Sequence, residues 1–133
     1  MMTKERFDML RDEFLEKETK TLYWKQGKYS LGDDALQNFR EVAAFMGLKP
    51  SEVVLAYLMK HVQSISLAVR TGQYIWDWST KEGEGLKQRI VDVRNYLLLL
   101  AASLEEEVEA NREKTKSTFP LPPCLKASQR RCD

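Results

Sequence analysis

The sequence is poor in the residues that build metal centres and disulfide scaffolds. It contains one histidine, His61, and two cysteines, Cys124 and Cys132, both near the C-terminus. This set cannot complete a structural zinc site of four Cys or of two Cys and two His. At 133 residues, the chain fits one domain with its own hydrophobic core.

Long apolar stretches are missing as well. No apolar run is longer than that from Tyr96 to Ala102, whereas a membrane-spanning helix needs about 20 apolar residues. The first residues, Met1 to Arg6, are not followed by the apolar segment of a secretory signal. We therefore expect a cytoplasmic protein with no membrane span, in a reducing compartment where a structural disulfide does not form.

The charge is unevenly distributed along the chain. Residues 1–110 carry 15 Lys or Arg against 18 Asp or Glu, and residues 111–133 carry 6 against 2. Affinity for duplex DNA comes from neutralised phosphates, so we expect no specific duplex DNA binding by a mildly acidic body. We expect one domain over residues 1–110, followed by a basic, Pro-containing flexible tail over residues 111–133.

Apolar residues recur at helical spacing in four segments, and no strand pattern of useful length is present. The expected helices are 3–20, 33–46, 50–71 and about 84 into the 110s, with a connector at 19–32 and a loop at 73–85. Gly47, Pro50 and Gly72 mark helix boundaries. The fold class is therefore all-α: a single compact bundle of about four helices with a disordered C-terminal tail.

Polar residues interrupt the apolar face of helix 50–71. His61 lies on the apolar row, and Lys60 and Ser64 share the next row. A half-buried Lys beside a His is costly unless an anion or a hydrogen-bond partner meets it. A ligand phosphate would satisfy the pair, and so would a snorkelling Lys with a hydrogen-bonded core His. The sequence leaves both interpretations open.

The last helix carries a ridge of four polar residues, Arg89, Asp92, Asn95 and Tyr96, on an otherwise apolar surface. A buried Asn95 amide without a hydrogen-bond partner would lower the free energy of unfolding. The ridge therefore forms either a hydrogen-bonded network between helices or a ligand site.

Two further positions are candidates for ligand binding. Asn38 lies one turn after Asp34 on the helix expected from residue 33. Lys28 and Tyr29 precede the start of that helix. A helix N-terminus with a Lys and an aromatic ring would suit a phosphate and a base.

These residues occur in an order that resembles a known family. The pieces Lys28-Tyr29, Asn38-Phe39, Lys60-His61 followed by Ser64, and Asp92-x-x-Asn95-Tyr96 are similar to the nucleotide modification associated domain of type 1, over residues 20–104. Its members are small helical proteins, many from phages, in gene neighbourhoods of modified-base and nucleotide metabolism. The resemblance implies a nucleotide-like small molecule as the ligand, and it implies no particular reaction.

The fold expectation is also similar to the all-α nucleoside triphosphate pyrophosphatases. Those enzymes hold Mg²⁺ with Glu-x-x-Glu and Glu-x-x-Asp on two helices, but here Arg89 stands three residues before Asp92, where Glu is required. The departure disfavours their chemistry. The chain also departs from the nucleotide modification associated family, whose pattern implies an acidic residue shortly before Tyr29, where Gln26, Gly27 and Lys28 stand.

The leading hypothesis is a protein that binds or sequesters a nucleotide derivative, with no cofactor assigned. One alternative is a divergent metal-dependent hydrolase, in which Asp34, Glu41, Glu84 and Asp92 would converge on Mg²⁺. The other alternative is a purely structural bundle, in which Lys60, His61, Asp92 and Asn95 would hydrogen-bond one another with no cavity beside them. We also expect a homo-oligomer, because the third and last helices have apolar surface to spare.

Overall fold

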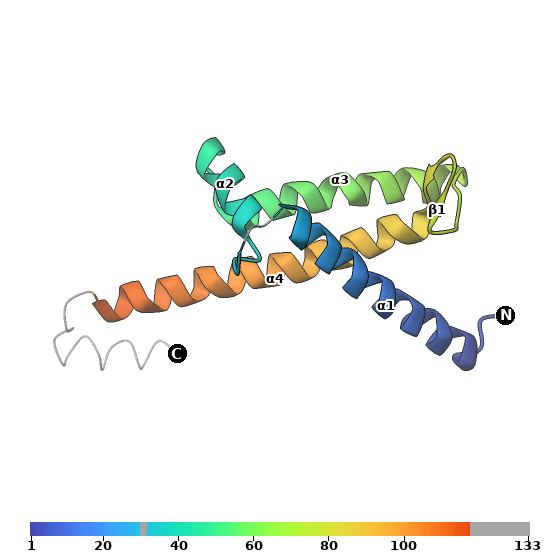
Figure 1. Cartoon of the computed structure of the whole chain (residues 1–133), viewed down its shortest axis with the longest axis horizontal. Coiled ribbons are helices and arrows are strands. Elements are labelled where there is room, and N and C mark those ends of the chain that lie inside the picture. The colour runs from blue at the N-terminus through green and yellow to red at the C-terminus, as the bar shows by residue number, and fades with distance from the viewer. Residues whose placement is uncertain (30–31, 118–133) are drawn as a thin grey trace. The chain divides into compact units, whose positions relative to one another are not determined.

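The computed structural model describes residues 1–29 and 32–117, and it confirms the all-α fold (Figure 1). Four helices account for most of the described chain: α1 (Lys4–Tyr29), α2 (Gln37–Met46), α3 (Pro50–Thr71) and α4 (Leu86–Ser117). Contacts divide the chain into two units, residues 1–103 and residues 104–133, and α4 runs through both.

Helix α1 is longer than the sequence predicts. The expected connector at 19–32 is wrong over residues 19–29, which continue the helix to Tyr29. A glycine inside a helix costs only about 1 kcal/mol relative to alanine, so Gly27 does not end it. A cation–π contact from Lys28 to Trp24, one turn earlier, supports this last stretch, with 5.1 Å between the ammonium nitrogen and the ring centroid.

The boundaries of α2 and α3 follow local signals. The Asp34 carboxylate accepts a hydrogen bond from the Leu36 N–H at 3.0 Å, and α2 begins at Gln37 rather than at Asp33, where the sequence predicts its start. Gly47 ends α2 in the left-handed conformation with φ 68°, as predicted. Helix α3 begins at Pro50 and ends at Thr71 before Gly72, also as predicted.

A small hairpin replaces part of the expected loop at 73–85. Strands β1 (Ser79–Thr80) and β2 (Gly83–Glu84) pair antiparallel, with Ser79 opposite Glu84. The loop before the hairpin is joined to the first residue of α4 by a hydrogen bond from the Leu86 N–H to the Ile75 carbonyl at 2.7 Å. Strands of two residues are too short to leave a period-two pattern in the sequence.

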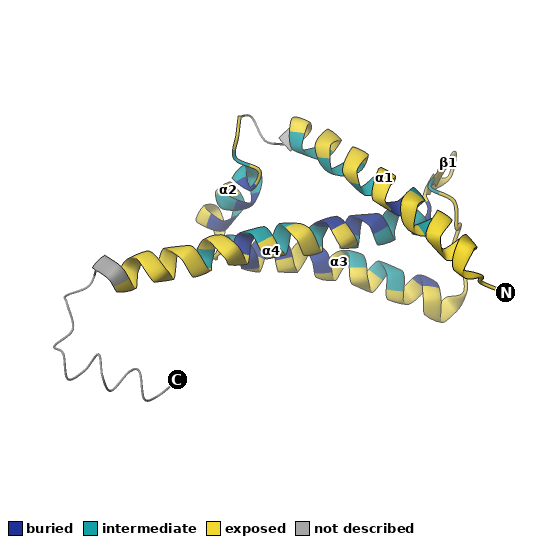
Figure 2. Cartoon of the chain, turned by 90° about the horizontal axis from the view of Figure 1, so that it is seen from below, coloured by how far each residue is buried: buried dark blue, intermediate teal, exposed yellow. Residues whose placement is uncertain are grey.

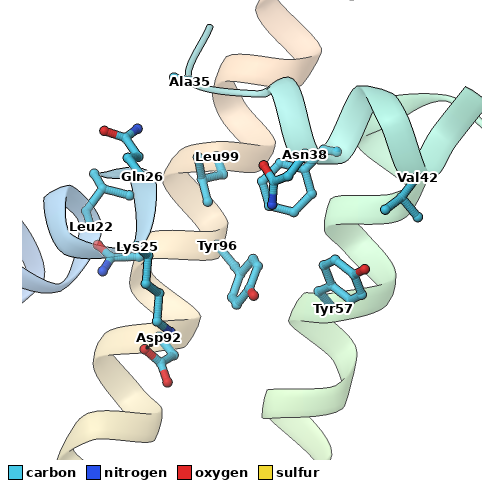
Figure 3. A pocket seen from close by; sticks show the side chains of 12 residues that line it. Leu22, Lys25, Gln26, Ala35, Asn38, Val42, Tyr57, Asp92, Tyr96 and Leu99 are labelled. Atoms are coloured by element: carbon cyan, nitrogen blue, oxygen red, sulfur yellow. Dashed lines mark hydrogen bonds and ion pairs between the residues drawn. The ribbon is translucent and has the colours of Figure 1, made fainter. Parts of the chain in front are cut away.

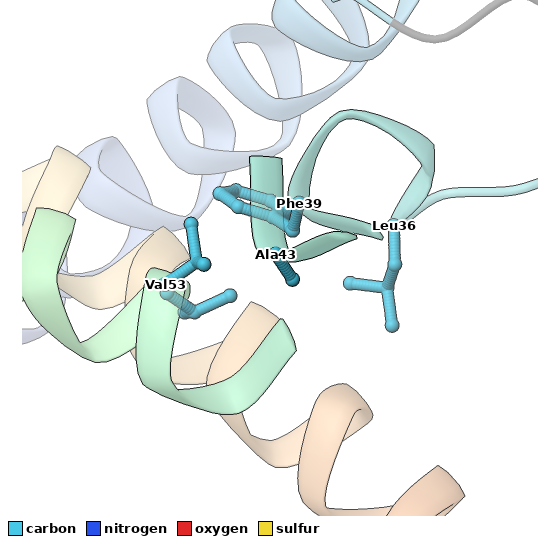
Figure 4. Packing of buried hydrophobic residues seen from close by; sticks show 5 residues of the cluster. Leu36, Phe39, Ala43 and Val53 are labelled. Carbon is cyan, nitrogen blue, oxygen red and sulfur yellow. The ribbon is translucent and has the colours of Figure 1, made fainter. Parts of the chain in front are cut away.

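The core lies where α2, α3 and α4 meet. Leu36, Phe39, Ala43, Val53 and Val54 form its buried cluster (Figure 4), and Tyr96, Leu99 and Leu100 of α4 pack against it. A second contact joins α1 to the loop after α3, with 5.0 Å between the ring centroids of Phe14 and Trp78. Figure 2 shows α1 and α2 on one side of the α3–α4 pair.

The second unit contains the distal part of α4. Residues 111–117, expected in the flexible tail, continue that helix. The remainder of the expected disordered tail, including both cysteines, lies outside the described residues. Among the described helices, no single one has the length and apolar composition of a membrane span; α2 and α3 together meet that test but are bent by 101° at their junction.

Two glycine substitutions test the helix boundaries. Gly47→Ala should lower the free energy of unfolding by about 1 kcal/mol, because an L-residue is disfavoured at the left-handed φ of 68°. The matched control Gly27→Ala, inside α1 where an added Cβ meets no atom within 4 Å, should raise it by up to about 1 kcal/mol. Urea unfolding followed by circular dichroism measures both. Destabilisation by Gly27→Ala would mean that α1 ends before Gly27 in solution.

Candidate ligand-binding site

A cavity of about 410 Å³ opens between the four helices of the first unit (Figure 3). Most of its lining is apolar or aromatic, and a few polar groups converge on it. The lining residues are Leu22, Lys25 and Gln26 of α1, Ala35, Asn38, Phe39 and Val42 of α2 and its approach, Tyr57 of α3, and Asp92, Asn95, Tyr96 and Leu99 of α4.

Three aromatic rings form one wall of the cavity. The ring of Phe39 lies 5.9 Å from that of Tyr57 and 6.3 Å from that of Tyr96, centroid to centroid. The two tyrosine rings lie 6.2 Å apart in an edge-to-face arrangement. Such pairs are worth about 1 kcal/mol beyond the area that they bury, so the wall is held in place by its own contacts.

His61 supports this wall from α3. Its ring stacks on Tyr96 at 5.1 Å with an interplanar angle of 27°. Partial burial lowers the pKa of His61 below its usual 6.5; Lys25 and Lys60 act in the same direction, and Asp92 and Glu84 oppose it. His61 is therefore neutral at pH 7, and it is a packing partner of Tyr96 rather than a cation for a phosphate.

A buried carboxylate forms the polar end of the cavity. The Asp92 side chain is 2% exposed, and its Oδ1 accepts hydrogen bonds from the Lys25 ammonium at 3.1 Å and the Gln88 amide at 3.2 Å. Within the described chain, its other oxygen, Oδ2, accepts none. A buried carboxylate is costly without a cation, so Lys25 fixes α1 against α4 at this point.

Two amide side chains face the same space. Asn95 is buried, and its Nδ2 donates to the Glu18 carbonyl of α1 at 3.2 Å. Asn38 is half-buried on α2 and lines the cavity, as do Tyr96 and Leu99 of α4 (Figure 3). Its side chain makes no hydrogen bond to any described residue. An amide offers both donors and acceptors, so Asn38 presents unused hydrogen-bonding capacity to the cavity.

The structure brings together only part of the predicted site. Asn38, Asp92, Asn95 and Tyr96 line the cavity, and His61 lies behind Tyr96. Ser64 accepts a hydrogen bond of 2.7 Å from Arg89, which joins α3 to α4, and neither residue lines the cavity.

The expected phosphate-binding lysines do not line the cavity. Lys60 is exposed on α3, and Lys28 lies in the last turn of α1, not before a helix N-terminus as predicted. Tyr29 ends that helix, and its side chain lies outside the described part of the chain.

Sequence reasoning missed Lys25, Gln26 and Leu22 on α1 and Tyr57 on α3. The first three fall in the segment that we expected to be a connector, where helical spacing carries no meaning. Continuing the helical period of α1 beyond Thr19 would have placed Leu22, Lys25 and Gln26 on one face.

The carboxylates of the metal-dependent alternative do not converge. Asp34 is bound by Arg40, with 2.7 Å between Oδ2 and Nε, and this bond holds its pKa below the usual value. Glu41 accepts from Gln37, and Glu84 is exposed in β2. No group of three or more His, Cys, Asp or Glu side chains that could hold a metal occurs among residues 1–29 and 32–117.

The structural alternative is not favoured either. Asp92 and Asn95 bond to α1 rather than to Lys60 and His61, and a cavity lies beside them. No protein-family model, curated protein or solved structure matches this chain. The family resemblance of the sequence stays a prediction.

The pairing of Asp92 with Lys25 predicts an asymmetric response to mutation. Lys25→Met should lower the free energy of unfolding by about 2 kcal/mol, because it leaves Asp92 buried without a cation. Asp92→Asn should cost less, since Lys25 is 36% exposed and regains water. The double variant should be more stable than Lys25→Met, as measured by urea unfolding. Additive losses in the double variant would show that the two side chains do not interact.

The lowered pKa of His61 predicts a pH dependence of stability. Well above pH 6.5, His61 is neutral in both the folded and the unfolded chain, and it contributes no pH dependence. As the pH falls through 6.5, the unfolded chain binds a proton before the folded chain does, so the free energy of unfolding decreases. It levels off once the pH is below the folded-state pKa. His61→Phe keeps a ring against Tyr96 and should remove this component from a series of urea titrations. An unchanged pH profile in that variant would assign the effect to other groups.

Proposed function

We propose that the chain binds a nucleotide or nucleotide derivative in the cavity of its first unit. The observation that carries the proposal is one cavity in which three aromatic rings meet a buried carboxylate and an amide with unused hydrogen-bonding capacity. A planar heterocycle with polar edges matches this combination better than a saturated apolar ligand does.

The size and walls of the cavity support a nucleobase as the buried part of the ligand. Its volume of about 410 Å³ lies within the range of small-molecule sites. Stacking of a base on an aromatic side chain is worth about 1–3 kcal/mol. Tyr57 and Tyr96 offer such rings from opposite helices.

The polar groups suit the edge of a base. Oδ2 of Asp92 can accept from a ring N–H or an exocyclic amine, and the Asn38 amide can donate and accept at once. Asn95 would act mainly by holding α1 in place, through its bond to the Glu18 carbonyl.

The charge of the cavity limits the number of phosphates. Lys25 is the one cation in the lining, and Asp92 neutralises it. A triphosphate would need further cations, so a nucleoside or a derivative with few phosphates is the favoured class. The resemblance to the nucleotide modification associated family supports the same class and a link to phage nucleotide metabolism, in which sequestration of a nucleotide signal is one form of the function.

The test is a thermal-shift series with nucleosides, mononucleotides, cyclic dinucleotides and ADP-ribose derivatives, with and without Mg²⁺. A ligand at about 100 times its Kd should stabilise the fold by about 2.7 kcal/mol, which raises the Tm by several degrees. Chromatography of the incubated ligand then separates binding, in which it is recovered intact, from turnover.

Two variants test whether a ligand-induced rise in Tm comes from binding in the cavity. Asn38→Ala should weaken binding about tenfold by removing hydrogen bonds to the base edge. Asn111→Ala, an exposed asparagine of α4 far along the chain, should leave the affinity unchanged. The proposal fails if none of these compounds raises the Tm, or if both variants bind equally well.

A further inference from the structure

The α3–α4 pair has one covered face and one bare face. Within residues 1–103, α1 and α2 lie on the side that holds the cavity, and no described element covers the other side (Figure 2). Large apolar side chains are exposed there: Leu55 and Met59 are each 46% exposed, Val62 38%, Val69 65% and Leu97 50%.

Helical spacing places these side chains together. Leu55, Met59, Val62 and Val69 follow one another at intervals of three, four or seven residues, next to the buried stripe of α3. On α4, Tyr96 faces α3 and Asp92 faces α1. Leu97 therefore points away from the cavity, on the same side of the pair as the α3 stripe. We call these five residues the back face.

The back face carries no charge over the length of α3. Between Glu52 and Arg70 the only Lys, Arg, Asp or Glu is Lys60, which helical spacing places on the opposite side of the helix. A contiguous apolar surface of this kind marks an interaction site.

The arrangement of the back face is self-complementary. Leu55 and Val69 stand equally far on either side of Val62, Glu52 lies beyond Leu55, and Arg70 lies beyond Val69. A two-fold axis near Val62 would run a second α3 antiparallel to the first. Each Glu52 end would then lie at the Arg70 end of the partner. Isologous interfaces require this kind of match between a surface and its own copy.

From this self-complementarity we infer that the back face binds a second copy of this chain, with two α3–α4 pairs forming a four-helix core. The 22 residues of α3 span about 33 Å, and two packed helices are about 20 Å wide. The face therefore offers about 600 Å² per copy, and about 1,200 Å² in total, which reaches the lower size of a stable interface. An unrelated protein or a membrane surface would not by itself match an acidic residue at one end of α3 and a basic residue at the other.

Sedimentation equilibrium of the full chain tests the dimer and its interface. The protein should be dimeric, and Val62→Asp should raise the dimer dissociation constant at least tenfold while the helical circular dichroism signal is kept. Leu67→Asp is the matched control, because Leu67 is 64% exposed on another side of α3, and it should leave the dimer intact. A monomer at every concentration, or a dimer that Val62→Asp does not weaken, would overturn the inference.

Charge reversal tests the antiparallel arrangement. Glu52→Arg and Arg70→Glu should each weaken the dimer by about tenfold, and the double variant should restore it, because like charges become opposite again. Glu52 also accepts a hydrogen bond from the Lys49 N–H at the start of α3, so the helical circular dichroism signal of each variant is compared with that of the unmodified chain. Val62→Cys, with Cys124 and Cys132 replaced by Ser, should form an intermolecular disulfide under mild oxidation. Failure of the double variant to recover, together with no crosslink at Val62, would rule out this two-fold arrangement. Nucleotide binding is measured separately, so the two proposals can fail independently.

Discussion

The buried carboxylate of Asp92 is the constraint on which the arrangement of the first unit depends. It is buried within the inner, largely apolar stretch of α4, where an unpaired negative charge would be strongly destabilising. Lys25 supplies the cation, and Gln88 adds a second hydrogen bond to the same oxygen. Lys25 lies on α1. The need of the Asp92 carboxylate for a cation therefore holds α1 against α4.

Further polar contacts align α1 once Lys25 is in place. The Asn95 amide bonds to the Glu18 carbonyl, and Lys87 reaches Glu13 at 3.1 Å. The Trp78 indole N–H also donates to Glu13, at 2.6 Å, which lowers the pKa of that carboxyl together with Lys87. Helix α1 thus contacts α4 largely through polar groups. Hydrogen bonds need particular distances and directions, so such a contact fixes position more sharply than an apolar one.

The cavity lies between a group of aromatic contacts and a polar pair. Phe39, Tyr57 and Tyr96 pack against one another on the side of α2 and α3, while Lys25 and Asp92 pair on the side of α1. The two groups of contacts have different chemistry and leave space where they meet. Space lined by aromatic faces and polar atoms suits a ligand that has both, and this match is the basis for the proposed nucleobase.

The two faces of the α3–α4 pair differ in what covers them. One face is covered by α1 and α2 and holds the cavity, whereas the other leaves Leu55, Val62 and Leu97 in contact with water. The apolar surface of α3 is larger than the part that the other helices of the same chain cover. A second copy would bury the remainder without blocking the cavity, because the two features lie on opposite sides of the pair.

Much of the secondary structure could be predicted because its signals are local. Gly47 can adopt the left-handed conformation that ends α2, Pro50 is suited to the first turn of α3, and Gly72 repeats the terminating role. The ridge of Asp92, Asn95 and Tyr96 also stood out, because polar residues on an apolar helix must find partners. These features depend on residues within one or two turns of one another.

The partners themselves depended on contacts between residues far apart in the chain. Nothing near Asp92 in sequence indicates that Lys25 will pair with it, or that Tyr57 will meet Tyr96 across the cavity. Such contacts become favourable only when whole helices are packed, which also decided that α1 continues through Gly27. Local propensities of about 1 kcal/mol set where helices can form. The larger free energies of burying apolar surface and pairing a buried charge decided how far α1 extends and which side chains share a site.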